Sequence, residues 1–109
     1  MTAHTLDRLA ALIASRRQAA SDTSYTRQLL DAGPERCAKK FGEEAVEAVI
    51  AAVGNDLTAF KGEAADVLYH LVVLLESRGV PLADVCATLE KRMGQSGLDE
   101  KAQRGPGKP

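Results

Sequence analysis

The sequence predicts an all-α fold, a bundle of about five helices built around a helical hairpin. Apolar residues recur three and four positions apart through most of the chain, which is the spacing of one helix face. No segment shows the alternation of apolar and polar residues that is typical of a β-strand. Because the chain has no Trp, two Phe and two Tyr, the core must consist of Leu, Val, Ile and Ala. That mixture favours helices that pack closely on other helices.

Two helices are expected in the first third of the chain. Apolar residues at helical spacing predict an amphipathic helix over residues 5–17. A polar break at 21–24 separates it from a short helix over residues 25–32. Gly33 follows directly and is expected to end this second helix.

Three further helices are marked by Pro and Gly. Pro34 suits the first turn of a long third helix, which ends at the Gly-Asn-Asp turn 54–56. The Asn or the Asp of this turn can cap a fourth helix, which is predicted over residues 57–78. A fifth helix is predicted over residues 81–93, again with Pro in its first turn.

We interpret residues 1–94 as one all-α domain and residues 95–109, which are rich in Gly and Pro, as a flexible tail. The second half of the fourth helix is apolar on most of its circumference, and such a helix must be buried on all sides. A small domain buries a limited fraction of its surface. A homodimer, in which the long helices of two copies form a four-helix-bundle core, would supply the missing cover.

The net charge of −1 gives no basic excess of the kind that a nucleic-acid-binding protein shows, so we expect no nucleic-acid partner. The longest apolar run, 67–75, contains a His and is too short to span a bilayer, so we expect no membrane partner. Cys37 and Cys86 are far apart and show no metal-ligand spacing, which favours two reduced thiols. Since no signal peptide is recognisable, these features predict a cytoplasmic protein.

Two acidic pairs lie on the predicted third and fourth helices. Glu44 and Glu47 are three residues apart and share one face of the third helix. Glu63 and Asp66 have the same spacing on the fourth helix. The short turn makes the two helices antiparallel neighbours, and the two pairs lie at matching distances from it. We therefore expect the four carboxylates to face each other across the hairpin.

Converging carboxylates raise one another's pKa or require a cation, because like charges close together disfavour the ionised form. Oxygen ligands suit Mg²⁺, Mn²⁺ or Ca²⁺, and Mg²⁺ is the first choice because it commonly binds carboxylates together with substrate phosphates. The alternative is a solvated acidic surface with ordinary helix pairs, such as Lys39–Glu43 and Lys40–Glu44. A di-iron site is disfavoured, since the Glu-x-x-His motif is absent.

The order Glu-x-x-Glu, then Glu-x-x-Asp on the next helix, resembles the metal motif of the all-α nucleoside triphosphate pyrophosphohydrolases. This superfamily includes MazG-type enzymes and dimeric dUTPases. Within it, the chain resembles the phosphoribosyl-ATP pyrophosphohydrolase family over residues 6–94. The acidic pairs specify only the superfamily, whereas Ser24-Tyr25-Thr26 and Tyr69-His70 select this member. The matching segments are Ser24-Tyr25-Thr26 with Leu29-Leu30, then 39–47, 63–71 and 89–92.

The resemblance implies an enzyme that cleaves the α–β phosphoanhydride of phosphoribosyl-ATP, giving phosphoribosyl-AMP and pyrophosphate in the second step of histidine biosynthesis. It implies Mg²⁺, or Mn²⁺, at the four acids. A separate chain would then supply the cyclohydrolase activity of the next step. Two alternatives remain open: a MazG-like enzyme that hydrolyses unwanted nucleoside triphosphates, and a non-enzymatic, dimeric helical module that binds a structural metal ion.

The same resemblance gives roles to other residues. Glu43 is expected to orient or deprotonate the attacking water, or else to pair with Lys39 at the surface. His70 is expected to bind substrate or to hold Asp66 in position, the alternative being a core histidine. The remaining residues expected to bind substrate are Lys39 and Lys40 at phosphate oxygens, and Ser24 and Tyr25 at the ribose phosphates or base, Ser24 being equally suited to cap a helix.

Overall fold

The computed structural model describes residues 3–20 and 24–94, and the predicted tail at 95–109 lies outside the described residues. Within the described ranges the chain is all-helical, as predicted. None of these helices is long and apolar enough to cross a membrane. The elements are α1 (Ala3–Ser15), a 3-10 turn η1 (Arg16–Gln18), α2 (Tyr25–Ala32), α3 (Pro34–Ala52), α4 (Leu57–Ser77) and α5 (Leu82–Met93).

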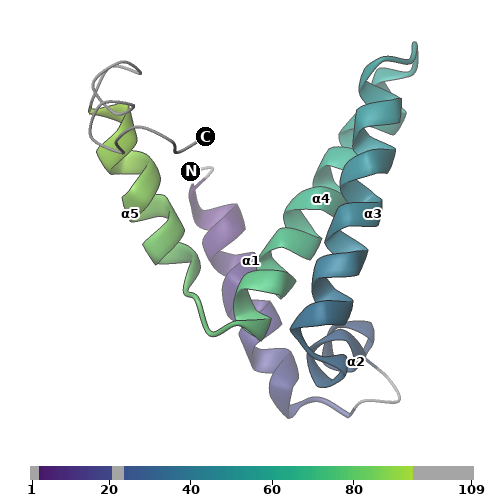
Figure 1. Cartoon of the computed structure of the whole chain (residues 1–109). Helices are drawn as coiled ribbons and strands as arrows, with labels where there is room; N and C mark the ends of the chain where they lie inside the picture. The colour runs from purple at the N-terminus through teal and green to yellow at the C-terminus, as the bar shows by residue number, and fades with distance from the viewer. Residues whose placement is uncertain (1–2, 21–23, 95–109) are drawn as a thin grey trace, which may run out of the picture.

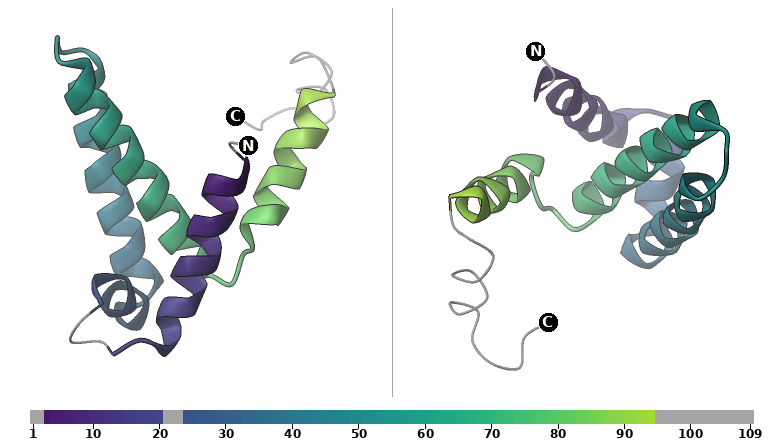
Figure 2. Two further views of the ribbon diagram at one scale, coloured as in Figure 1. Left: turned by 180° about the vertical axis from the view of Figure 1, so that it is seen from behind. Right: turned by 90° about the horizontal axis from the view of Figure 1, so that it is seen from above.

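The helices are arranged as a V (Figure 1). The antiparallel helices α3 and α4 form one arm, and α1 and α5 lie on the other. The short helix α2 lies at the vertex, beside the beginning of α3. The view from above shows α5 standing apart from the α3–α4 hairpin (Figure 2). The predicted helical hairpin is therefore confirmed, and its tip points away from the rest of the molecule.

The helix ends have local causes. Gly33 has a φ of +96°, a conformation that favours glycine, and it turns the chain from α2 directly into Pro34 at the start of α3. At the hairpin turn, the Asp56 side chain accepts a hydrogen bond of 3.1 Å from the Ala59 backbone N–H. Of the two residues that the sequence offered as the cap of α4, the structure thus uses the Asp.

The buried core lies near the vertex, where α1, α2, the start of α3 and the end of α4 meet. Cys37 belongs to this core, with its Sγ 3.2 Å from the Leu29 carbonyl oxygen, whereas Cys86 is exposed. Both cysteines are free, as the sequence predicted. The buried apolar residues among those described are Ile13, Leu29, Leu30, Cys37, Val72 and Val73.

Part of the hairpin exposes apolar side chains. The second half of α4, which the sequence indicated as needing cover, is partly buried within one chain, since Val72 and Val73 lie in the core. The exposure is instead greatest on α3 and at the hairpin turn. We call the following residues, which are 58–84% exposed, the apolar hairpin surface: Val46, Val49, Ile50, Val53 and Leu57.

Candidate functional site

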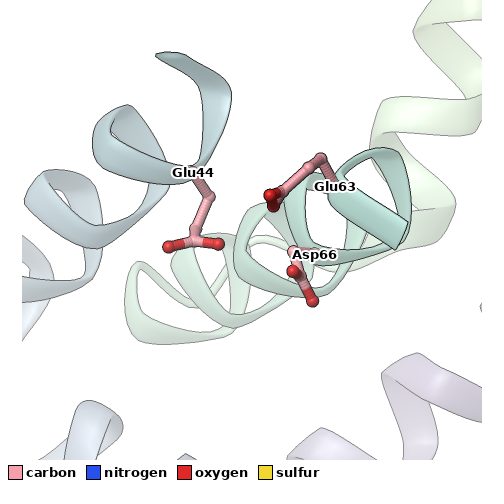
Figure 3. Close-up of side chains that lie close together, drawn as sticks. All are labelled: Glu44, Glu63 and Asp66. Atoms are coloured by element: carbon pink, nitrogen blue, oxygen red, sulfur yellow. The ribbon is translucent and has the colours of Figure 1, made fainter. Parts of the chain in front are cut away.

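Three of the four predicted acids come together between α3 and α4. One carboxylate oxygen each from Glu44, Glu63 and Asp66 lies within 4.8 Å of the other two. Figure 3 shows Glu44 reaching from α3 toward the two acids of α4. The three acids converge because the short turn between α3 and α4 makes the helices antiparallel, so residues at similar distances from the turn face each other. We call Glu44, Glu63 and Asp66 the carboxylate cluster.

The fourth acid, Glu47, is exposed and lies outside the carboxylate cluster. Its negative charge nevertheless acts on Glu63, a member of the cluster. Partial burial raises the pKa of Glu63 above its usual value, and the negative charges of Glu47, Asp66 and Glu44 raise it further, in that order. Glu47 therefore contributes to the negative potential of the cluster without converging on the same point.

The chemistry of the cluster fits a hard divalent cation. All the donors are carboxylate oxygens, which Mg²⁺ and Mn²⁺ prefer. With Mg–O bonds of about 2.1 Å, neighbouring oxygens of an octahedral Mg²⁺ site are about 3.0 Å apart and opposite oxygens about 4.2 Å. Three oxygens within 4.8 Å of one another can therefore reach a common ion after side-chain movements of about 1–2 Å. A cation would also relieve the repulsion that raises the pKa of Glu63.

A lysine lies at one edge of the cluster. Lys40 Nζ is 3.5 Å from Glu43 Oε1 and 3.8 Å from Glu44 Oε2. The Lys40–Glu44 pair is the one that the sequence suggested, but Glu43 pairs with Lys40 and not with Lys39, which is exposed. Glu43, the predicted catalytic carboxylate, is thus next to the cluster but not part of it.

His70 is buried, with 7% of its surface exposed. Its Nδ1 is 2.9 Å from the Asp66 backbone carbonyl oxygen, which can only accept, so Nδ1 carries the proton. Its Nε2 faces the Tyr25 hydroxyl at 3.5 Å, and the rings of Tyr69 and Tyr25 meet it edge-on. His70 is therefore both a core residue and a contact of Asp66, through the backbone and not through the carboxylate.

The two predicted residues at the start of α2 differ in accessibility. The Ser24 hydroxyl accepts a hydrogen bond of 3.1 Å from the Arg27 backbone N–H, so Ser24 caps α2. Tyr25 is 49% exposed, and the negative charge that its phenol acquires at high pH is the first cause that raises the pKa of Lys40 above its usual value, ahead of Glu43 and Glu44. Tyr25 thus contacts His70 directly and is coupled to Lys40 only electrostatically.

Thr26 and Arg27 make further contacts, and their partners outside α2 could not be predicted from the sequence. Thr26 Oγ1 is hydrogen-bonded to the Tyr69 hydroxyl, which ties α2 to α4 behind His70. Arg27 forms an ion pair of 2.9 Å with Asp31 and donates to the carbonyl oxygens of Arg17, at 2.7 Å, and Ala19, at 2.6 Å. Only the i,i+4 spacing of the Arg–Asp pair is readable from sequence.

Comparison with known proteins places the chain in a family. The family model described as phosphoribosyl-ATP pyrophosphohydrolase matches residues 6–93, which include every residue of the candidate site. A phosphoribosyl-ATP pyrophosphatase of Methylobacterium radiotolerans is 61% identical, over 97% of this chain and 99% of the relative. This chain is also 58% identical to a phosphoribosyl-ATP pyrophosphatase of Cereibacter sphaeroides, over 92% of this chain and 97% of the relative. It is 57% identical to a phosphoribosyl-ATP pyrophosphatase 1 of Rhodopseudomonas palustris, over 95% of this chain and 97% of the relative. The chain therefore belongs to the phosphoribosyl-ATP pyrophosphohydrolase family.

Proposed function

We propose that this protein hydrolyses the α–β phosphoanhydride of phosphoribosyl-ATP, giving phosphoribosyl-AMP and pyrophosphate in the second step of histidine biosynthesis. The observation that carries the proposal is the convergence of Glu44, Glu63 and Asp66 in a chain that the family model covers from residue 6 to residue 93. Relatives named phosphoribosyl-ATP pyrophosphatase, at 55–61% identity, support the choice of substrate.

The metal in this proposal is Mg²⁺, with Mn²⁺ as a substitute. Glu44, Glu63 and Asp66 would hold one or more ions, and Glu47 would add charge alongside them. The bound metal supplies neutralisation of the phosphate oxygens and a bound water of lowered pKa. The all-carboxylate donor set and the raised pKa of Glu63 support this assignment.

Glu43 is the residue that we assign to the attacking water. Its carboxylate is next to the cluster, on the same helix as Glu44, and its side chain is 47% exposed. It has oxygen lone pairs left to accept a proton from a water molecule at the edge of the cluster. The Lys40 ammonium at 3.5 Å restrains the side chain on that side.

The substrate contacts follow from the cations and hydroxyl groups around the cluster. Lys40, and next to it Lys39, would bind phosphate oxygens, since ammonium groups are strong donors to phosphate. The hydroxyl of Tyr25, a half-exposed residue, would contact the ribose phosphates or the base. Ser24 would assist chiefly by fixing the start of α2, because its oxygen already accepts from Arg27. His70 would hold Asp66 and Tyr25 in place.

We further propose that two copies form a homodimer in the cytoplasm. The apolar hairpin surface, in which Val53 is 84% exposed, supports an association that buries it, because exposed apolar clusters commonly mark interfaces. The hairpins of two copies would then form a four-helix-bundle core. The two free cysteines support a reducing compartment.

The test is a direct assay. Purified protein is mixed with phosphoribosyl-ATP and Mg²⁺, and the release of pyrophosphate and phosphoribosyl-AMP is measured. ATP and dUTP are assayed at the same concentrations, because a MazG-like enzyme would prefer such nucleotides. Faster turnover of phosphoribosyl-ATP supports the proposal. Faster hydrolysis of ATP or dUTP would contradict the substrate, and no turnover of any of them would favour a non-enzymatic metal-binding module.

A further inference from the structure

Lys40 occupies an unusual position for a residue that is expected to bind phosphate. Its ammonium is already paired with two carboxylates, Glu43 at 3.5 Å and Glu44 at 3.8 Å. The partner in the cluster, Glu44, has a side chain that is only 12% exposed, and that of Lys40 is 26% exposed. The Lys40–Glu44 pair is thus more sheltered from solvent than an ordinary surface ion pair, so screening weakens it less.

Glu44 belongs both to the proposed metal site and to an ion pair with a lysine. It is the one member of the carboxylate cluster that α3 contributes, and it is also a partner of Lys40. Among the ion pairs of the described residues, Lys40 provides the one cation that reaches the cluster. Without a metal, the negative charge of the cluster is therefore offset locally by this single ammonium.

A divalent ion in the cluster would change this balance. The ion would draw a Glu44 oxygen to about 2.1 Å, well inside the distance at which the ammonium now lies. A metal ion and an ammonium on the same carboxylate repel each other, so binding of the ion weakens the Lys40–Glu44 pair. Lysine has a flexible four-carbon stem and three donors, so its head group can move away at little cost.

Resting on the function proposed above, we propose that Lys40 is an internal counter-ion of the metal site: it neutralises Glu44 in the metal-free protein and is displaced when the divalent ion binds. Metal binding would thereby free the lysine for a phosphate oxygen. The coupling is reciprocal, so a phosphate that draws Lys40 away from Glu44 would tighten metal binding.

The proposal is tested by metal binding without substrate. Mn²⁺ is titrated into the full-length protein, and free Mn²⁺ is followed by electron paramagnetic resonance. Lys40→Met removes the competing cation, so it should lower the Kd for Mn²⁺ by about five- to tenfold, the effect expected of an ion pair stronger than a surface pair. Lys61→Met is the matched control, because it makes the same change in net charge at an exposed position on α4 and should change the Kd less than twofold.

Each outcome decides the matter. An unchanged or raised Kd in Lys40→Met would overturn the counter-ion role, since a lysine that merely shapes the site would leave weaker metal binding when removed. Lys40→Gln gives a second neutral variant if Lys40→Met does not fold, and Lys40→Arg should keep the Kd of the natural protein. If the natural protein itself binds no Mn²⁺, the metal assignment of the proposed function fails and this inference fails with it. If the natural protein binds Mn²⁺ and Lys40→Met leaves the Kd unchanged, this inference is overturned but the metal assignment stands.

Discussion

The His70 imidazole donates a hydrogen bond from Nδ1 to the Asp66 backbone carbonyl oxygen, 2.9 Å away and one helical turn earlier. This contact fixes the ring that meets Tyr25 through its other nitrogen at 3.5 Å. A single buried side chain therefore connects the backbone of a cluster residue to a residue of the proposed substrate site. The relationship assigns His70 a positioning role and not a direct part in the chemistry.

Replacing His70 by Ala should lower kcat by about 10- to 100-fold, the range seen when supporting contacts of a metal site are lost. The buried ring also packs against Tyr69 and Tyr25, so the free energy of unfolding should fall by about 2 kcal/mol. His70→Asn keeps an N–H group near the position of Nδ1 and should recover part of kcat. Steady-state kinetics and urea unfolding measure both effects. Equal kcat for the two variants would argue against positioning through Nδ1.

Neutralising the cluster should separate activity from folding. Glu63→Gln removes a charge from the group whose pKa is raised by burial and by the neighbouring acids. We expect turnover to fall at least about 100-fold, because a neutral amide is a poor ligand for Mg²⁺. The melting temperature of the metal-free protein should rise, since repulsion among the acids is relieved. Pyrophosphate release and thermal unfolding in EDTA test this, and a lower melting temperature would contradict the repulsion.

The stability of the metal-free protein should depend on the protonation of Glu63. Its folded-state pKa is raised, so between the ordinary Glu value, about 4.3, and the raised value the folded chain binds more protons than the unfolded chain. Stability in EDTA should therefore fall as the pH rises through this window and stay lower above it. Saturating Mg²⁺ competes with the proton and should remove the trend. Urea unfolding in EDTA at several pH values across this window measures the trend, and Glu63→Gln, which cannot titrate at this position, should not show it.

The sequence could predict the carboxylate cluster because both determinants are local. The helical period places Glu63 and Asp66 on one face, and the short turn sets the level at which Glu44 meets them. The all-helical fold followed from the same period. Glu47 shows the limit of this reasoning, since it lies one turn from Glu44 with the right spacing, yet it is exposed and is not one of the three acids that converge.

Contacts that depend on tertiary packing could not be predicted. The bond between Thr26 and Tyr69 requires α2 to cross α4 at one particular place, which no local pattern encodes. The pairing of Glu43 with Lys40, where the sequence offered Lys39 as an alternative partner, depends on side-chain rotamers on one helix. Likewise, the apolar pattern indicated α4 as the helix in need of cover, but α4 is partly covered by its own chain and the exposed apolar surface lies on α3 and at the turn.

The Thr26–Tyr69 hydrogen bond should contribute measurably to stability. Burial is the first cause that raises the pKa of Tyr69, and the hydrogen bond to Thr26 partly opposes it. Tyr69→Phe and Thr26→Val each leave one hydroxyl without this partner, so each should lower the free energy of unfolding by about 1 kcal/mol. The double variant should lose less than the sum of the two, because the bond can be lost only once. Strict additivity in urea unfolding would show that the two hydroxyl groups are not coupled.

The apolar hairpin surface should control the oligomeric state. Ile50 is 65% exposed in the single chain, and Val49 beside it is exposed to the same extent. Ile50→Asp would place a charge in an apolar interface and should shift the protein from two copies to one at micromolar concentration, because burying an unpaired charge is strongly unfavourable. Ile50→Val conserves the apolar character and should leave the dimer intact. Light scattering coupled to gel filtration measures the mass, and a value near 11.6 kDa for the natural protein would refute the dimer.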